Sequence, residues 1–308
     1  MILSASRRTD IPCFYSDWFI NRIKARYVFS RNPMNHAQIS RVSISPDVVD
    51  CIVFWTKDAE NIIDKLPLFD KAGYKYYFQF TLTPYDKTIE KNLRDKNDIE
   101  NTFIRLSKLI GKERVLWRYD PIILNETLDI NFHIKQFKRM CDKLCNYTES
   151  VTISFIDMYS KLKTNAVRII TDDEINELSI IIAETAKDYG LIPKACSESI
   201  DLSVYGIERA SCIDKNLIER ICDTKLDITQ DINQRKNCGC YESIDIGAYN
   251  TCINDCIYCY ANNNFETTAR RYNSHNPISE LLIGTIVEGE KINDRKVFSN
   301  IIKQQEMF

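Results

Sequence analysis

The sequence has little of what several common classes of protein require. It contains only eight glycines in 308 residues, and it has no Walker loop, GxGxxG turn, nucleophile elbow or HExxH motif. Ordinary P-loop, Rossmann, α/β-hydrolase and zincin sites are therefore not expected. Its three histidines, His36, His133 and His275, are scattered, which argues against a histidine metal site.

Strong charge and long apolar runs are also missing. The formal net charge is −2, so nucleic-acid binding is not supported by the overall balance, although it is not excluded. No apolar run approaches the roughly 18 residues of a membrane span, and the first residues lack the apolar core of a signal peptide. We therefore expect a cytoplasmic protein with no membrane partner.

Cysteine, by contrast, is abundant. Eight of the twelve cysteines fall between positions 196 and 259, and these are Cys196, Cys212, Cys222, Cys238, Cys240, Cys252, Cys256 and Cys259. Disulfides are the competing explanation, but a reducing compartment would keep the thiols free. Clustered free thiols favour metal binding.

The first two hundred residues alternate between apolar strand-like runs and helical stretches. The expected strands lie at 2–6, 51–55, 76–83, 114–121, 151–157 and 191–198. The clearest helices span 98–110, 129–145 and 171–189, the last with a Thr171/Glu174 capping box, and 27–44 is expected to form an inserted hairpin. About six parallel strands can form an open doubly wound sheet or a barrel, and the pattern favours a partial or full TIM-like (β/α) barrel.

The composition changes after residue 210. We expect a (β/α) barrel over 1–210, a Cys-rich iron–sulfur segment over 211–265 that caps the barrel mouth, and a C-terminal tail over 266–308.

Polar residues follow nearly every expected strand, and in a barrel these strand ends open onto one mouth. For any one residue a helix cap or an ion pair is the commoner role, but the set as a whole shares one location. The candidate catalytic residues are Asp10, Lys57, Asp120, Asp157 and Glu198. The candidate substrate-binding residues are Arg7, Arg8, Gln79 and Arg118, whose guanidinium groups suit a small anionic substrate.

Cys252, Cys256 and Cys259 form a CxxxCxxC run, which a tight loop can bring to one side of the chain. This run, with Tyr258 before its third cysteine, resembles the loop of radical S-adenosylmethionine (SAM) enzymes. The resemblance implies a [4Fe–4S] cluster whose open iron chelates SAM, with Tyr258 and Asn262 as cofactor contacts. It also implies a reducing partner such as ferredoxin or flavodoxin, and a 5′-deoxyadenosyl radical that abstracts a hydrogen from the substrate.

The position of the loop departs from that superfamily, in which it follows the first strand. Here it follows six expected strands, which requires a permuted arrangement or a C-terminal segment folded back over the mouth. The stretch 243–249 is a candidate for a strand that leads into the loop.

Cys238 and Cys240 are separated by one glycine and could together supply two ligands to a metal. With Cys196 or Cys212 they would complete a second site for zinc or another cluster. Alternatively, one of them supplies a fourth ligand to the first cluster and closes the position that SAM needs. Spacing alone leaves both alternatives open.

A wider resemblance covers nearly the whole chain and joins seven motifs. The sequence looks like a bacterial family labelled as a domain of unknown function. The motifs that carry this resemblance lie at 4–12, 54–57, 79–83, 117–121, 233–235, 238–240 and 245–262. We expect a radical-SAM-like enzyme. The alternatives are a non-redox cluster enzyme with Asp120, Asp157 or Glu198 as acid or base, and a zinc protein that captures a phosphate-bearing ligand or RNA.

Overall fold

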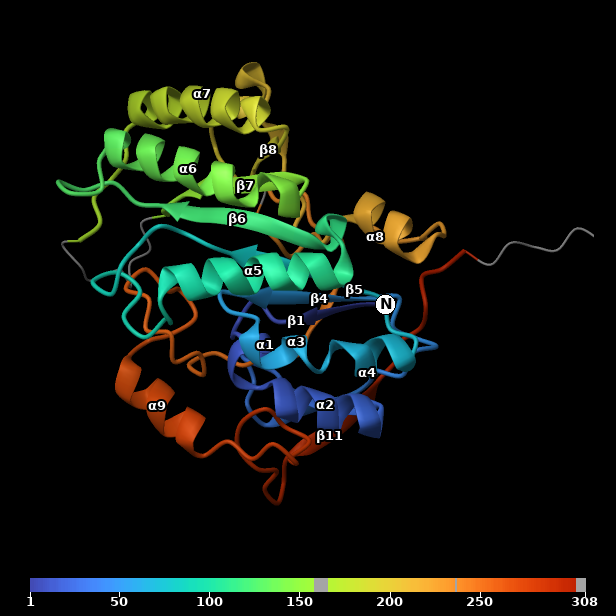
Figure 1. Ribbon diagram of the computed structural model, residues 1–308. Coiled ribbons are helices and arrows are strands. Elements are labelled where there is room, and N and C mark those ends of the chain that lie inside the picture. The colour runs from blue at the N-terminus through green and yellow to red at the C-terminus, as the bar shows by residue number, and fades with distance from the viewer. Residues whose placement is uncertain (158–165, 236, 303–308) are drawn as a thin grey trace, which may run out of the picture.

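A parallel eight-stranded sheet forms the centre of the protein. The computed structural model describes residues 1–157, 166–235 and 237–302 (Figure 1). The strand order is β10-β1-β4-β5-β6-β7-β8-β9, and each neighbouring pair is parallel. The strands are β1 (Ile2–Ala5), β4 (Cys51–Thr56), β5 (Tyr76–Thr81), β6 (Val115–Ile122), β7 (Ser150–Phe155), β8 (Ile192–Ala195), β9 (Glu208–Arg209) and β10 (Ile244–Asp245). The six strands expected from the sequence are present in the expected order, and β9 and β10 add one short strand at each edge.

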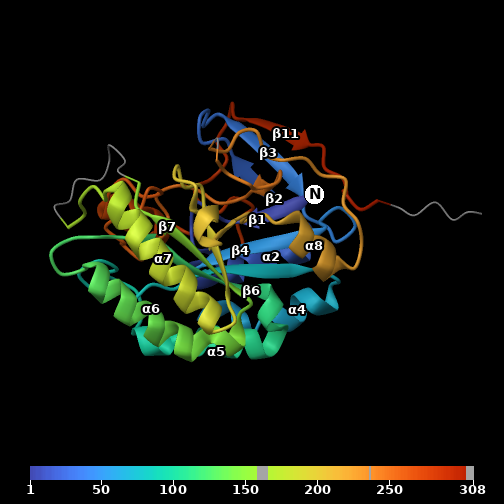
Figure 2. The same cartoon turned by 90° about the horizontal axis from the view of Figure 1, so that it is seen from above.

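The two faces of the sheet carry different apolar clusters, because successive side chains of a strand point to opposite sides. On the outer face, Leu3, Phe54 and Phe78 share a core with three long helices. On the inner face, Val53 and Tyr77 pack with Leu217 of a short helix. Figure 2 shows α5, α6 and α7 along one side of the sheet and α8 on the other. Strands covered on both faces read as continuous apolar runs, which is why they could be recognised in the sequence.

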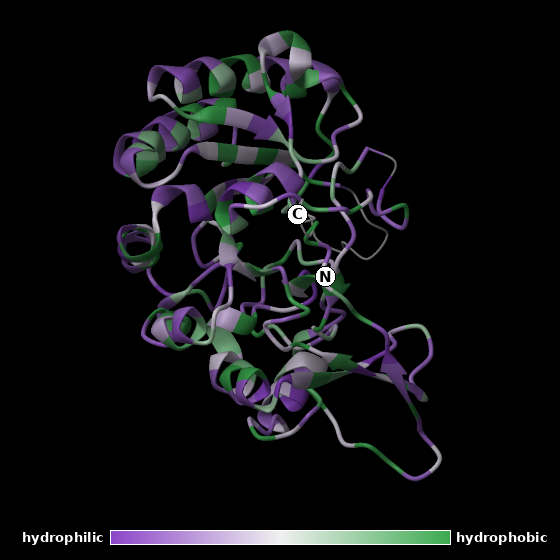
Figure 3. Ribbon diagram, turned by 90° about the vertical axis from the view of Figure 1, so that its right-hand side faces the viewer, coloured by the Kyte–Doolittle hydropathy of each residue, from purple (hydrophilic) through white to green (hydrophobic). Residues whose placement is uncertain are grey.

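The outer helices begin at side-chain caps, and their alternating hydrophilic and hydrophobic residues are visible in Figure 3. Asp95 caps α5 (Lys96–Ile110), so this helix begins two residues before the predicted start at 98. Asp129 caps α6 (Ile130–Leu144), and the predicted Thr171/Glu174 capping box is present at α7 (Asp172–Asp188). The shorter helices before β5 are α1 (Ile11–Phe14), α2 (Ser16–Ala25), α3 (Glu60–Ile63) and α4 (Leu66–Lys71).

A closed barrel is not found. Within the described residues the sheet ends at β9 on one side and β10 on the other, and these two edges do not pair. Each edge strand has only two residues, and the chain between them crosses the inner face instead of extending the sheet. There α8 (Lys215–Cys222) packs into the inner cluster, and the Tyr77 hydroxyl donates to the Cys212 carbonyl at 2.7 Å.

A second, three-stranded sheet lies beside the main one. The predicted hairpin is present as antiparallel β2 (Tyr27–Arg31) and β3 (Gln38–Ser43). A third strand, β11 (Lys291–Arg295), joins β3 in parallel, and α9 (Phe265–Asn273) precedes it. In the described part of the chain, no helix combines the length and apolar character needed to cross a membrane.

Candidate functional site

A large cavity of about 1200 Å³ opens where the carboxyl ends of the parallel strands meet. Seven cysteines line it: Cys196, Cys212, Cys238, Cys240, Cys252, Cys256 and Cys259. Most of the predicted catalytic and substrate-binding residues line it too, and these are Arg7, Arg8, Asp10, Lys57, Arg118, Asp120 and Asp157. Parallel strands deliver their ends to one edge, which accounts for this convergence.

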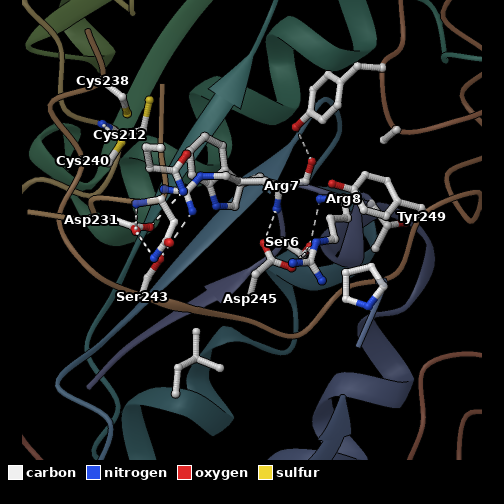
Figure 4. Close-up of a pocket in the computed structure, with 18 of the residues that line it drawn as sticks. Ser6, Arg7, Arg8, Cys212, Asp231, Cys238, Cys240, Ser243, Asp245 and Tyr249 are labelled. Carbon is white, nitrogen blue, oxygen red and sulfur yellow. Dashed lines mark hydrogen bonds and ion pairs between the residues drawn. The ribbon is translucent and has the colours of Figure 1, made fainter. Parts of the chain in front are cut away.

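Asp245 of β10 fastens this edge strand to the end of β1. Its carboxylate accepts hydrogen bonds from the hydroxyls of Ser4 at 2.9 Å and Ser6 at 2.6 Å, and from the backbone N–H of Arg7 at 2.8 Å. The backbone N–H of Gly247 also donates to it, at 2.9 Å. A Cβ at position 247 would lie 2.0 Å from the Ser6 hydroxyl oxygen, so this close approach requires glycine. Figure 4 shows Asp245 facing Ser6.

Two arginines flank the indole of Trp55 on the cavity wall. The guanidinium carbons of Arg7 and Arg118 lie 5.0 Å and 5.8 Å from the centre of the Trp55 rings, within the range of cation–π contacts. Arg118 also forms an ion pair with Asp120, whose other oxygen accepts from Ser154. Burial opposes the charge of Arg7, but its neighbours Cys240, Cys212 and Asp245 raise its pKa overall.

The CxxxCxxC loop is held by residues 89–92. Ile257 N–H donates to the Ile89 carbonyl at 3.0 Å, and Asn92 N–H donates to the Asn254 carbonyl at 3.1 Å. Glu90 and Cys256 form an isolated antiparallel bridge. The loop therefore has a defined backbone position beside the carboxyl edge of the sheet.

The Glu90 carboxylate is the centre of a buried charge network beneath this loop. It accepts from Lys57 Nζ at 2.7 Å and from Lys96 and the Tyr258 hydroxyl. Burial would raise the pKa of Glu90, but the two ammonium groups hold it at about 2. Burial lowers the pKa of Lys96, whereas at Lys57 the charge of Glu90 outweighs burial and raises the pKa.

Burial is the main influence on the three loop thiols and raises the pKa of each. Cys252 and Cys259 interact electrostatically with one another and with Cys256, while Lys57 and Lys96 partly offset the effect at Cys256. A metal would be needed to stabilise these thiols as thiolates, because burial alone favours the protonated form.

A second group of thiols lies on the inner face of the sheet. The sulfurs of Cys196 and Cys212 are 3.7 Å apart, and the backbone N–H of Cys212 donates to Cys240 Sγ at 3.3 Å. The Cys240 thiol also interacts with the thiols of Cys212 and Cys238, and Figure 4 shows these three side chains together. In the described residues, no group of three or more His, Cys, Asp or Glu side chains converges, as it stands, on a position that would hold a metal ion.

The remaining predicted residues have structural partners. Asp10 caps α1 by accepting from Cys13 N–H at 3.0 Å and also accepts from Lys57 N–H at 2.8 Å. Burial raises the pKa of Asp10 to about 7 despite these bonds. Asp157 pairs with Arg235, and the Asn262 amide donates to the Cys252 carbonyl at 2.6 Å.

Gln79 and Glu198 do not line the large cavity. The Gln79 amide donates to the Cys212 carbonyl at 2.8 Å and so fixes the backbone of one member of the second thiol group. Glu198 lines a smaller neighbouring pocket and accepts from Phe155 N–H at 2.9 Å. Burial, with Asp157 and Asp120 nearby, raises its pKa to about 7.

Three residues of the site were not predicted from the sequence. Glu90 lies in an irregular loop with no recognisable pattern, and only its fully buried position reveals it. Asp245 belongs to a motif noted in the sequence, and Trp55 ends the apolar run of β4, but their partners are distant along the chain. Neither periodicity nor spacing marks such contacts.

These observations define an α/β protein with a parallel sheet and a cysteine-lined cavity at its carboxyl edge. The chain belongs to the family described as Domain of unknown function (DUF1848), which matches residues 2–261. The match begins with β1 and ends just beyond Cys259, so it includes the main sheet and both thiol groups. No curated protein and no solved structure matches the chain.

Proposed function

We propose that this protein is an iron–sulfur enzyme in which Cys252, Cys256 and Cys259 hold a [4Fe–4S] cluster with one iron open to SAM. The observation that carries the proposal is the parallel pairing of β10 with β1, in which Leu3 is opposite Ile244 and Ser4 is opposite Asp245. In space, the cysteine loop therefore follows an edge strand whose neighbour is β1. This placement supports the permuted arrangement that the resemblance to radical SAM enzymes requires, on a sheet that we interpret as a partial barrel.

The surroundings of the loop suit an added polar group. Thr9 Oγ1, Asn254 Nδ2 and Asn262 Oδ1 are buried without a hydrogen-bond partner in the described residues. Thr9 and Asn254 line the large cavity, and because buried polar atoms are rarely left unsatisfied, their unpaired atoms favour a bound partner there. The ammonium group of Lys57 lies 5.3 Å from the ring centre of Tyr258 and adds positive charge beside the thiols.

When bound, a reduced cluster of this kind would supply the electron that cleaves SAM to methionine and a 5′-deoxyadenosyl radical, which removes a hydrogen atom from the substrate. The chain itself would orient the substrate and exclude water. Arg7, Arg8 and Arg118 line the same cavity and suit a small anionic substrate. A ferredoxin or flavodoxin would be a suitable reducing partner.

A second candidate function keeps the cluster but uses it as a Lewis acid. Glu198 favours this alternative, because burial raises its pKa to about 7, which suits general acid–base catalysis near neutral pH. Asp120 and Asp157 are engaged with Arg118 and Arg235 and would first have to leave these ion pairs. We rank this function second, since Glu198 faces the smaller pocket.

Anaerobic reconstitution with iron and sulfide tests the proposal. We expect an EPR signal of a reduced [4Fe–4S] cluster that changes when SAM is added, and formation of 5′-deoxyadenosine measured by mass spectrometry. Cys252→Ala should lose the cluster, whereas Cys145→Ala, at the end of α6, should retain it.

The possible outcomes separate the two functions. Iron no higher in the wild type than in Cys252→Ala would refute the cluster. An EPR signal unchanged by SAM, without 5′-deoxyadenosine, would refute the radical mechanism and leave the Lewis-acid function standing.

A further inference from the structure

Four cysteines that are distant in the sequence meet on the inner face of the sheet, away from the CxxxCxxC loop. Cys196 follows β8, Cys212 follows β9, and Cys238 and Cys240 lie on the returning chain. All four pack with the inner-face cluster, whereas Cys256 and Cys259 pack with the outer-face cluster. The two thiol groups therefore belong to different parts of the core.

Backbone contacts bring these four positions together. Cys196 N–H donates to the Ile153 carbonyl at 2.9 Å, and Ala210 N–H donates to the Ala195 carbonyl at 2.8 Å. The Ser211 hydroxyl donates to the Gly239 carbonyl at 2.8 Å. A Cβ at position 239 would lie 3.1 Å from the Ala210 carbonyl oxygen, so the glycine allows the CxC turn to approach this strand closely.

The observed sulfur separation suits one tetrahedral ion. A zinc–sulfur bond of about 2.3 Å gives a tetrahedron with sulfurs about 3.8 Å apart. Cys196 and Cys212 are separated by 3.7 Å, the backbone N–H of Cys212 lies 3.3 Å from Cys240 Sγ, and Figure 4 shows Cys238 beside Cys212 and Cys240. In a [4Fe–4S] cluster each cysteine binds a different iron, which would hold the thiols considerably farther apart. In the described residues the four sulfurs do not yet converge on one position, so metal binding would require the cysteine side chains to move.

The surroundings also suit a negatively charged metal–thiolate centre. Four thiolates around a zinc ion carry a net charge of −2. Arg118 Nη1 donates to Cys212 Sγ at 2.8 Å, and Arg7 lines the same cavity as Cys240. The backbone N–H of Cys212 donates to Cys240 Sγ. Donors of this kind orient metal ligands and stabilise their charge.

We propose that Cys196, Cys212, Cys238 and Cys240 form a structural zinc site. With four protein ligands the ion has no open position, so it fastens the returning chain to the inner face and takes no part in the reaction. This site is independent of the proposed cluster, because it shares no ligand with the CxxxCxxC loop. It also leaves Cys238 and Cys240 unavailable as a fourth ligand of that cluster.

The metal content of the purified protein tests this inference. We expect about one zinc per chain without any reconstitution, and the visible bands of tetrahedral cobalt thiolate after Co²⁺ is exchanged for zinc. Cys238→Ser and Cys240→Ser should lose most of this zinc. Cys252→Ala and Cys145→Ala should retain it, which distinguishes the site from the cluster loop.

Several results would overturn the zinc site. These are wild-type protein without zinc and without cobalt bands, zinc that depends on Cys252 instead of Cys240, iron in place of zinc, or a Cys196–Cys212 disulfide in freshly isolated protein. Should the serine variants fail to fold, zinc stoichiometry and cobalt spectra of the wild-type protein still decide the question. Protein that lacks zinc but still gives the EPR signal of the cluster would refute the zinc site and leave the proposed enzyme function standing.

Discussion

Replacing Glu90 with glutamine should unbalance the buried charges beneath the cysteine loop. Glu90 is fully buried and accepts from Lys57 at 2.7 Å and from Thr83 at 3.0 Å, besides Lys96 and Tyr258. The depression of its pKa from 4.5 to about 2 corresponds to about 3 kcal/mol of stability. Removing one partner of a buried ion pair costs about 3–5 kcal/mol. Both arguments predict that Glu90→Gln lowers the free energy of unfolding by about 3 kcal/mol.

Two measurements check this effect. Urea denaturation followed by tryptophan fluorescence gives the loss of stability. Mass spectrometry of alkylated peptides gives the reactivity of Cys256, which should rise because Glu90 lies opposite Cys256 in the bridge that holds the loop. In the wild type, the contribution of Glu90 is fully present above pH 4.5 and is lost as the pH falls towards 2.

Glu100→Gln is the matched control. Glu100 is also buried and forms ion pairs with Arg139 and Lys143, but these two partners are 44% and 32% exposed and lie on α6. We expect a smaller loss of stability, because water can solvate the remaining charges, and no change in the alkylation of Cys256. An unfolding free energy for Glu90→Gln within about 0.5 kcal/mol of wild type, with unchanged Cys256 reactivity, would refute the role assigned to Glu90.

Three further perturbations have defined outcomes. Gly247→Ala places a methyl group 2.0 Å from the Ser6 hydroxyl oxygen. It should therefore lower the free energy of unfolding, measured by urea denaturation, by about 1–3 kcal/mol and speed amide hydrogen exchange in β10. An unchanged exchange rate in β10 would contradict this. Burial lowers the pKa of His133 from 6.5 to about 4, so only the unfolded state binds a proton between these values, and stability should fall by up to about 3 kcal/mol as the pH falls through this range. His133→Gln should flatten this pH dependence, and an identical slope in the two proteins would exclude His133 as its cause. Thr171→Ala removes the capping box of α7 and should lower the unfolding free energy by about 1 kcal/mol, whereas an unchanged denaturation midpoint would show that the cap contributes nothing.

The parts of the fold that depend on local sequence were predictable. The run 51–55 is continuously apolar because β4 is covered on both faces, and the Thr171 cap is visible as a short motif. Both signals lie within a few residues of the element that they specify.

Closure of the sheet could not be predicted in the same way. The edge strands β9 and β10 have two residues each, too few to show a period. Whether they meet depends on how 196–235 and 237–241 pack across the inner face, which is decided by distant contacts such as the one between Tyr77 and Cys212. The sequence therefore predicted a parallel sheet but could not decide between an open and a closed one.

At the site, cysteine spacing predicted that thiols would gather but left their partners open. Cys238 and Cys240 could serve either group by spacing alone. The structure associates them with Cys212 and, through it, with Cys196. Glu90 illustrates the opposite case, since an isolated glutamate in a loop gives no sign that two lysines and a tyrosine surround it.

The order of the two thiol groups along the chain gives them unequal importance for the fold. Cys240 lies four residues before Ile244, where β10 begins, and the CxxxCxxC loop follows β10. The register of β10 beside β1 is fixed by the bonds of Asp245 to Ser4 and Ser6, and the proposed zinc site would fasten the chain just before this strand. Releasing Cys238 and Cys240 would loosen β10 and, with it, the position of the loop. Releasing the CxxxCxxC loop leaves the inner-face thiols attached to β8 and β9. Loss of the inner-face thiols should therefore disturb the loop, whereas loss of the loop cysteines should leave the inner-face thiols in place.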